Sequence, residues 1–373
     1  MKTLTFKKIS LFVLGHIALL FGVLLTGIAL LRFPETASQG ISDGIDLCLG
    51  TLIPSLYPFM ILSSFITQTE FFPKGLKLLD WPADKIFALN GKCIIVIILS
   101  LIGGLPLGCK MVCDLYRKSE ISLMQGQRMM LFCFCSGPAF TICSVGLYML
   151  GSKQAGLLAF VSMVLSALTI GILSRFFGEE NIIIMSTKKE CEATPFSVSL
   201  VRAVSNGSTA MLNVCAWVIL FSCISRLIEI MPFNQSFNFT VNTLLEITNG
   251  TRLASGILPL PIITAIISFG GLCGHCQVMP YIISLKLKYK YFLTSRIVSA
   301  ALSAIYCELL MKIFPVTYEV FSLGTLPDEK NMTASAICSI SMLVTSGLFL
   351  LGDGAVFRIK RKKDHRNQRW SEV

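Results

Sequence analysis

Two double glycines mark places where polar groups could act inside an apolar setting. Gly103-Gly104 and Gly270-Gly271 each close a long apolar stretch, and each is followed six residues later by a polar side chain, Lys110 and Gln277 respectively. A membrane helix that ends at such glycines exposes backbone groups, and the N-terminus of a helix favours an anion. We therefore interpret the two motifs as parts of an anion site. The alternatives are a tight seam between packed helices for the glycines and a side chain that reaches the membrane interface for Lys110.

Three ionisable side chains are further candidates, because charged groups at membrane depth are costly and mark functional sites. Glu246 could couple proton or cation movement, or it could be a solvated carboxylate paired with Arg252. Arg296 could bind the carboxylates of a cargo through two parallel hydrogen bonds, or its side chain could extend to the cytoplasmic face. His275 could accept a proton near neutral pH, or it could be a structural group with satisfied hydrogen bonds. The sequence leaves these alternatives open.

Proline and glycine interrupt two more apolar segments. Ser136-Gly137-Pro138 breaks the segment 129–150 and offers a hydroxyl and free carbonyl groups there, and Pro54-Ser55 does the same for the segment 45–67. Proline removes one backbone donor and clashes with the preceding turn of a helix. The predicted substrate-binding residues are Pro54, Ser55, Gly103, Gly104, Lys110, Ser136, Gly137, Asn206, Glu246, Asn249, Gly270, Gly271, His275, Gln277 and Arg296.

Motifs for enzymatic chemistry are missing from the sequence. It contains no H-E-x-x-H motif, no pair of acidic motifs and no G-x-x-x-x-G-K-S/T loop, which carry metal-dependent or nucleotide-dependent reactions. We therefore expect a protein that is not an enzyme, with no catalytic residue and no cofactor, and we exclude ATP-driven transport by this chain alone. The stretch from Cys273 to Cys276 matches C-x-x-C, but no second ligand pair for zinc follows it. Packing between helices is the favoured role of these cysteines.

The composition places the protein in a membrane. Of its 373 residues 54% are hydrophobic and only 14% are charged, with a mean hydropathy of +0.73, whereas a soluble protein carries about 25% charged residues. A bilayer is crossed by helices of about 20 apolar residues, because backbone groups in lipid must bond within their own segment. We predict an all-α polytopic membrane protein with 8–10 transmembrane or re-entrant helices, in which two repeats, inverted relative to each other, contain broken helices.

The charge distribution predicts the orientation. The net charge is +11, and much of it lies in the last sixteen residues, while three lysines precede the first apolar run. Basic residues next to a span stay in the cytoplasm, so both termini should be cytoplasmic and nucleic acid is not an expected partner. The first run is interpreted as an uncleaved span. An even number of crossings is then required, but nine apolar segments are present: 9–31, 45–67, 93–109, 129–150, 155–177, 203–227, 253–274, 292–314 and 332–352. We therefore expect that at least one segment re-enters, or that the set includes one hairpin more.

The two halves of the chain look related. An offset of 167 residues takes Gly40 to Gly207 and Cys48 to Cys215, and the same offset takes the first double glycine to the second. Opposite starting faces for the two halves suggest inverted repeats, the arrangement of secondary transporters that bind substrate at the repeat interface. The predicted organisation is an anchor (1–39), repeat 1 (40–177), a cytoplasmic hinge (178–202), repeat 2 (203–315), a last span (316–352) and a basic cytoplasmic tail (353–373).

Five motifs resemble one family. They are "GIDLCLGTLIPSLYPFMILSSFI", "GGLPLGCKMVCDLYRKSEIS", "CSGPAFTICSVG", "LLEITNG" and "SFGGLCGHCQV", and their wording and order are similar to the sporulation integral membrane proteins of the YlbJ (SpoVV) type, which belong to the nucleoside-recognition Gate domain group. The resemblance implies a carrier that moves dipicolinate, a small aromatic dianion, across a forespore membrane. The sequence departs from the family at Leu105, Cys135, Ser136 and the stretch Cys273 to His275.

These observations favour a multi-pass secondary transporter of a small anionic metabolite, dipicolinate during endospore formation, in the cell membrane or a forespore membrane. A nucleoside carrier is the alternative within transport, since uncharged cargo would not need Lys110 or Arg296. A sporulation membrane scaffold without transport is the alternative from another class, although a scaffold has no use for broken helices. The expected partners are the lipid bilayer and the small-molecule cargo, and the chain could form homo-oligomers.

Overall fold

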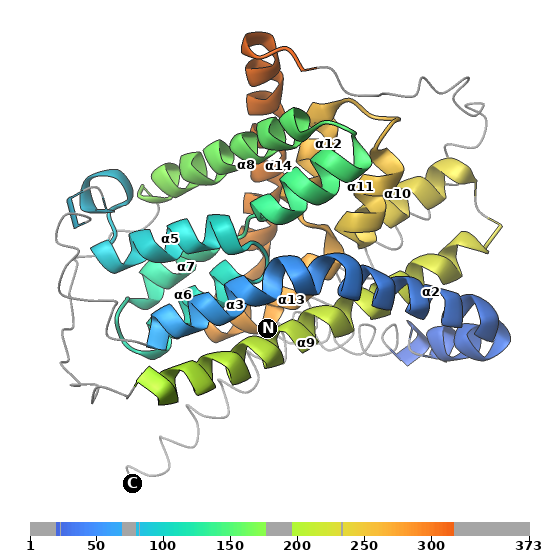
Figure 1. The fold of residues 1–373 in the computed structure, drawn as a ribbon, viewed down its shortest axis with the longest axis horizontal. Helices are drawn as coiled ribbons and strands as arrows, with labels where there is room; N and C mark the ends of the chain where they lie inside the picture. Colours follow the sequence, from blue (N-terminus) through green and yellow to red (C-terminus); the bar gives the residue numbers. More distant parts are fainter. Residues whose placement is uncertain are drawn as a thin grey trace, which may run out of the picture. The chain divides into compact units, whose positions relative to one another are not determined.

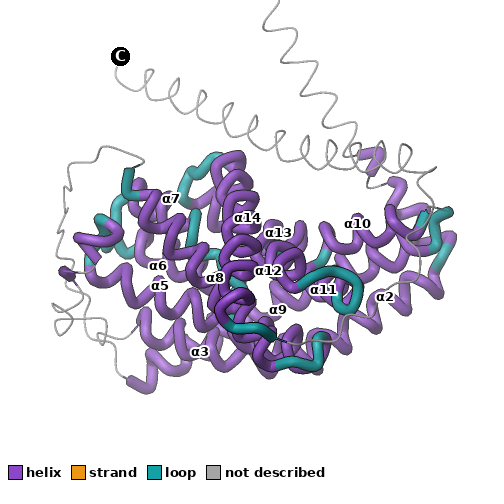
Figure 2. Tube along the Cα trace, turned by 90° about the horizontal axis from the view of Figure 1, so that it is seen from above, coloured by secondary structure: helices purple, strands orange, loops and turns teal. Residues whose placement is uncertain are grey.

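The described part of the chain is helical. The computed structural model describes residues 20–22, 24–68, 80, 81, 83–176, 196–232 and 234–316, and within these ranges it contains helices and loops but no strand (Figures 1 and 2). This confirms the all-α prediction. The elements are α2 (Pro34–Leu47), the π-helix η1 (Cys48–Leu52), α3 (Ile53–Gln68), the π-helix η2 (Ala83–Phe87), α5 (Gly91–Gly103), α6 (Leu107–Arg117), α7 (Leu123–Met130), the π-helix η3 (Ala139–Met149), α8 (Lys153–Ser174), α9 (Phe196–Glu229), α10 (Gln235–Leu245), α11 (Ile247–Ala254), α12 (Leu260–Phe269), α13 (Gly271–Ser284) and α14 (Tyr289–Ile313).

The chain divides into two units. One comprises residues 1–38, 227–238 and 327–373, and the other comprises residues 39–226 and 239–326. Every contact and pocket discussed below lies within the second unit. The predicted last span and basic tail lie outside the described residues, apart from Val316, as do most of the hinge and much of the N-terminal anchor. The predicted organisation into repeats therefore stays a prediction.

Membrane-spanning helices are present among the described residues. Three helical stretches are long and apolar enough to cross a bilayer: Lys153–Ser174, Ser197–Glu229, and Leu260–Ser284, which comprises α12 and α13. A fourth span results if Leu20–Arg32 and Pro34–Gly50 are taken as one bent span. This confirms a polytopic membrane protein. Two further predicted segments, 93–109 and 129–150, contain shorter apolar helices, Gly91–Gly103 and Ala139–Met149, because the chain breaks within them. Apart from its last residue, the segment 292–314 lies within the unbroken helix α14.

The helix breaks occur at the glycines and prolines that the sequence singles out. Helix α5 ends at Gly103, since Gly104 has a φ of +74°, and α12 ends before Gly270, whose φ is +89°. L-residues with a side chain rarely adopt such angles. Between α7 and η3 the residues 131–137 are not helical. The interruptions at both double glycines and at Ser136-Gly137-Pro138 fall where they were predicted. The predicted break at Pro54-Ser55 is wrong, because the chain stays helical from η1 through α3, and proline is tolerated in the first turn of a helix.

Two segments related by the offset of 167 residues pack antiparallel. In Figure 1, α2, η1 and α3 follow one another alongside α9. The Cys48 thiol donates to the backbone oxygen of Cys215 at 3.9 Å, Gly40 packs against Cys223, and Gly207 packs against Ile61. Residue numbers thus rise along one segment as they fall along the other. Antiparallel packing is the arrangement that the predicted inverted repeat requires, and the repeat itself stays a prediction.

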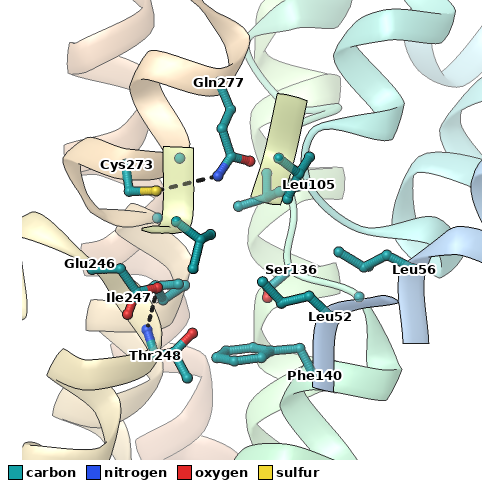
Figure 3. Close-up of a pocket in the computed structure, with 15 residues that line it drawn as sticks. Leu52, Leu56, Leu105, Ser136, Phe140, Glu246, Ile247, Thr248, Cys273 and Gln277 are labelled. Carbon is teal, nitrogen blue, oxygen red and sulfur yellow. Dashed lines mark hydrogen bonds between the residues drawn. The ribbon is translucent and has the colours of Figure 1, made fainter. Parts of the chain in front are cut away.

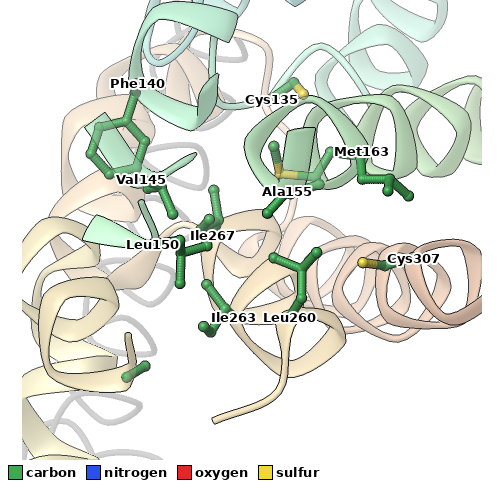
Figure 4. Packing of buried hydrophobic residues seen from close by; sticks show 13 residues of the cluster. Cys135, Phe140, Val145, Leu150, Ala155, Met163, Leu260, Ile263, Ile267 and Cys307 are labelled. Carbon is green, nitrogen blue, oxygen red and sulfur yellow. The ribbon is translucent and has the colours of Figure 1, made fainter. Parts of the chain in front are cut away.

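A buried apolar cluster fixes the position of α12. Leu260, Ile263 and Ile267 of α12 are fully buried against η3, α8 and α14 (Figure 4). Beside this cluster the Ser299 hydroxyl lies 3.2 Å from the Ser166 hydroxyl and 2.9 Å from the Ser268 hydroxyl. Burial of aliphatic side chains and hydrogen bonds between helices both stabilise this packing. The cluster therefore fixes the helix that ends at Gly270, and with it one wall of the site below.

Candidate functional site

A pocket in the second unit lies at the helix breaks before η3, α11 and α13, beside the turn between α5 and α6. Its empty volume is about 560 Å³, including the part that is open to the outside. Figure 3 shows residues from α11 and α13 facing residues from η1, α3, η3 and the α5–α6 turn across the gap. The lining residues are Leu52, Leu56, Leu105, Ser136, Gly137, Phe140, Val214, Val218, Glu246, Ile247, Thr248, Gly270, Cys273, Gly274 and Gln277.

Three helices begin at this pocket. Helix η3 starts after Pro138 and α13 starts after Gly270, and no side chain caps either N-terminus. Helix α11 starts after Glu246, whose side chain caps it. The first N–H groups of a helix have no partner within the helix, and they carry partial positive charge. The pocket therefore contains two helix N-termini that are open to a ligand and one that is occupied by a carboxylate.

The glycines allow the backbone segments around the pocket to approach closely. A Cβ atom at Gly104 would stand 2.8 Å from the backbone nitrogen of Gly137, and a Cβ atom at Gly270 would stand 2.4 Å from the Phe134 ring. Neither distance is compatible with a real side chain in the present packing. The double glycines thus serve both purposes considered for them, because they end helices and let neighbouring backbone pack against those ends.

Glu246 is a buried carboxylate in the wall of the pocket. Its side chain accepts hydrogen bonds from the backbone N–H groups of Thr248 at 2.9 Å and Asn249 at 2.7 Å, and Glu246 is 1% exposed. A carboxylate at a helix N-terminus is stabilised by these bonds and by the helix dipole. Arg252 is exposed, and among the described residues no ion pair joins it to Glu246. Each carboxylate oxygen accepts one N–H and keeps further acceptor capacity.

The basic candidates lie outside the pocket lining. Lys110 forms an ion pair with Asp114 one turn further along α6, with 3.3 Å between Nζ and Oδ2. Arg296 of α14 is 1% exposed and donates to the backbone oxygens of Phe134, at 2.6 Å, and Leu131. No lysine, arginine or histidine is among the described residues that line the pocket. A cargo bound there would therefore contact neither of the two predicted cationic side chains in this conformation.

Arg296 satisfies the carbonyl groups that the break after α7 leaves without helical partners. Its guanidinium lies between two aromatic rings, 4.9 Å from the centre of Phe134 and 5.5 Å from that of Phe292. Arginine donors and cation–π contacts together offset the cost of burying the charge. Arg296 does not extend to the cytoplasmic face, nor does it point into the pocket. It holds the segment that leads into Ser136 and Gly137.

His275 is a structural group with satisfied hydrogen bonds, which is one of the two alternatives that the sequence left open. Its Nε2 lies 3.0 Å from the backbone oxygen of Phe269 and its Nδ1 lies 2.8 Å from the Tyr289 hydroxyl. Because a carbonyl oxygen only accepts, Nε2 carries a proton and donates it to the Phe269 carbonyl group. The ring also packs edge-on against Phe134 and Phe292. His275 therefore links the break at Gly270 to the start of α14.

Five of the predicted residues are brought together in the lining, and the others lie elsewhere. The five are Ser136, Gly137, Glu246, Gly270 and Gln277. Pro54 and Asn206 are exposed on α3 and α9, Asn249 is half-buried in α11, and the side chain of Ser55 lies outside the described residues. Gly103, Gly104 and Gly271 form the breaks without being part of the lining.

The lining also contains residues outside the predicted substrate-binding set. Most of them are apolar, namely Leu52, Leu56, Leu105, Phe140, Val214, Val218 and Ile247. Aliphatic side chains of a membrane helix give no signal that separates a pocket from lipid or from core. Thr248 could have been predicted as a lining residue, because it lies two residues after Glu246, which caps α11. Cys273 also belongs here, since it accepts a hydrogen bond from the Gln277 amide at 3.3 Å.

The fold and the pocket define a polytopic helical membrane protein with a pocket at its helix breaks. Comparison with known proteins finds similarity to the "Sporulation integral membrane protein YlbJ" of Bacillus subtilis (strain 168). The identity is 23% over 320 residues, which cover 75% of this chain and 78% of the relative. This similarity confirms the predicted resemblance to the YlbJ-type sporulation integral membrane proteins. No family model matches the chain, and no solved structure matches it.

Proposed function

We propose that this protein is a secondary transporter of a small anionic metabolite, and that the metabolite is dipicolinate during endospore formation. The observation that carries the proposal is the convergence of three helix starts on one pocket, two of them without a side-chain cap. Transporters place their substrates at such broken helices, whose N-termini point at anionic groups. The printed description of the relative, a sporulation integral membrane protein, supports the setting.

The pocket matches the chemistry of a planar aromatic diacid. Its apolar side chains, among them Leu52, Phe140 and Val218, can cover the two faces of a ring. Carboxylates would meet the free N–H groups at the starts of η3 and α13, with the Ser136 hydroxyl beside them. In this proposal backbone dipoles, and not Lys110 or Arg296, compensate the charge of the cargo.

A nucleoside is the second candidate, and one observation favours it. The lining includes the Glu246 carboxylate, the Gln277 amide and two hydroxyl groups, but no cationic side chain among the described residues. Such a set of donors and acceptors suits an uncharged polar cargo, because every group can find a partner without a net charge to balance. We rank the nucleoside second because the printed description of the relative names sporulation.

The test is uptake by sealed proteoliposomes that contain the purified full chain. Labelled dipicolinate and labelled uridine are offered in parallel to the wild type, to Gln277→Leu and to Lys110→Ala. We expect dipicolinate uptake that falls about tenfold in Gln277→Leu, since a hydrogen bond in a site contributes about 1 kcal/mol or more, and that is unchanged in Lys110→Ala. Uptake of uridine alone would establish the second candidate. If neither compound enters, the non-transporting scaffold becomes the better explanation.

We also propose that the protein resides as a multi-pass protein in a forespore membrane with both termini in the cytoplasm. The basic residues at both ends of the chain support this orientation, since such residues are retained on the cytoplasmic side. Thiol labelling tests the orientation: single cysteines are placed at residues 2 and 370 of a variant without the 14 native cysteines, expressed in the cell membrane of non-sporulating cells, and intact and permeabilised cells are compared. Labelling of either site by an impermeant reagent in intact cells would contradict the orientation.

A further inference from the structure

The charges around the pocket do not balance. Glu246 is the acidic side chain in the lining, and the described lining residues include no basic one. Two backbone N–H groups at the start of α11 stabilise its carboxylate, and they are its own capping partners. An anionic cargo in the same pocket would thus lie beside a second negative charge. Like charges that share a site disfavour the state in which both are ionised.

The groups that face Glu246 offer no counter-charge. Among the described residues, the thiols of Cys48, from η1, and Cys273, from α13, interact electrostatically with this carboxylate. The elements opposite, η3 and α9, present Phe140, Val214 and Val218 to the pocket. Within the described residues no arginine, lysine or histidine acts on Glu246. The charge of this carboxylate must therefore be removed in another way when an anion enters.

We propose that the pocket binds its anion together with a proton, and that Glu246 carries this proton. One proton is taken from the water on the side where the anion enters, forms an O–H bond on the Glu246 carboxylate, and returns to water when the anion leaves on the other side. The protonated carboxyl group also gains a donor that can bond a carboxylate oxygen of the cargo. The transporter is then a proton–anion symporter. This inference rests on the proposed function, because it requires an anion in the pocket.

Two modes of transport in the same proteoliposomes test the proposal. In counterflow, labelled external dipicolinate exchanges against unlabelled internal dipicolinate without any gradient. In driven uptake, the outside is more acidic than the inside, the membrane potential is clamped, and a trapped pH dye reports proton entry. We expect the wild type to perform both and to acidify the lumen as dipicolinate enters. A gradient of about one pH unit should give about a tenfold accumulation ratio for each proton carried.

Glu246→Gln separates the two modes. The amide keeps one acceptor for the backbone of α11 but carries no titratable proton. We expect counterflow to continue in this variant, while driven accumulation falls to the level of simple equilibration and proton entry stops. Asp114→Asn is the matched control, because Asp114 is a carboxylate outside the pocket lining that pairs with Lys110. It should keep both modes.

The outcomes distinguish this inference from the proposed function. Wild-type counterflow of dipicolinate without proton entry would overturn the proton coupling and leave the transporter proposal standing. Absence of any dipicolinate transport by the wild type would overturn both. If Glu246→Gln is inactive in both modes, Glu246→Asp decides: dipicolinate-linked proton entry in this variant supports the proposal, and counterflow without proton entry contradicts it.

Discussion

Glu246 and Arg296 are both buried ionisable residues, and opposite kinds of backbone group satisfy their hydrogen bonds. Both residues are 1% exposed, and both bond to the backbone groups that broken helices leave unpaired. Glu246 accepts from N–H groups at the start of α11, whereas Arg296 donates to carbonyl groups after the end of α7. The difference is that Glu246 lines the pocket, while Arg296 is covered by two aromatic rings. A buried charge can act on a cargo only where part of its bonding capacity faces a cavity.

Arg128 has the same structural role as Arg296. Arg128 of α7 is buried and donates to the backbone oxygens of Phe87 and Ala88, at the end of η2. Cations are stabilised at helix C-termini, where carbonyl groups carry partial negative charge. The two arginines therefore hold helix ends in place, and the predictions below test whether Glu246 differs from them as the structure indicates.

The largest effect on stability is expected for Arg296→Met. The substitution leaves the carbonyl groups of Leu131 and Phe134 buried without their donor, and hydrogen bonds to charged groups contribute about 1.5–3 kcal/mol each. We expect the free energy of unfolding to fall by about 3 kcal/mol or more, measured by chemical unfolding in detergent. Arg296→Lys should lose less, because the ammonium group can still reach one carbonyl. A variant of normal stability that has lost transport would instead place Arg296 at the cargo.

Gly270→Ala should be the next most damaging change. At a φ of +89° any side chain is strained, and the new Cβ would meet the Phe134 ring at 2.4 Å. We expect a loss of about 2 kcal/mol, since left-handed backbone alone costs about 1–2 kcal/mol for an L-residue, together with weaker binding of cargo. The matched control is Gly50→Ala, where no atom lies within 4 Å. Equal effects of both substitutions would show that the break at Gly270 does not depend on close packing.

Glu246→Gln should cost less stability than Arg296→Met but change function more. It removes one of the two capping bonds of α11, and the loss of a cap costs about 1 kcal/mol. Thermal unfolding in detergent measures this loss, and the transport assays described above measure the loss of proton coupling. A fall in stability as large as that of Arg296→Met would remove the contrast between the two residues.

Lys110→Ala should have the smallest effect. The ion pair with Asp114 is partly exposed and spans one helical turn, and such pairs contribute about 0.3–0.5 kcal/mol. We expect unchanged dipicolinate uptake and almost unchanged unfolding, with Asp114→Ala as the partner variant. If uptake collapses in Lys110→Ala but not in Asp114→Ala, the lysine contacts cargo in a conformation other than the one described here.

The sequence by itself determined the class of protein and the points where its helices break. Long apolar runs can only be membrane helices, because lipid offers backbone groups no partner. Gly104, Gly270 and Pro138 end or begin helices for local reasons of backbone angle and missing donors. The motifs that the chain shares with YlbJ-type proteins were also visible without a structure. The capping of α11 by Glu246 is equally local, since its partners lie two and three residues further on.

Only the tertiary structure decided which of the polar candidates face the pocket. The carbonyl partners of Arg296 lie 162 and 165 residues earlier in the chain, so nothing in its neighbourhood predicts them. Asn206 was predicted to bind substrate, but it is exposed on α9 and is not part of the pocket lining. The direction of a side chain depends on which helices pack beside it, and this is set by contacts between distant segments. The sequence suggests that Arg296 belongs to a binding site. In the structure its guanidinium instead donates to carbonyl groups at the end of a distant helix.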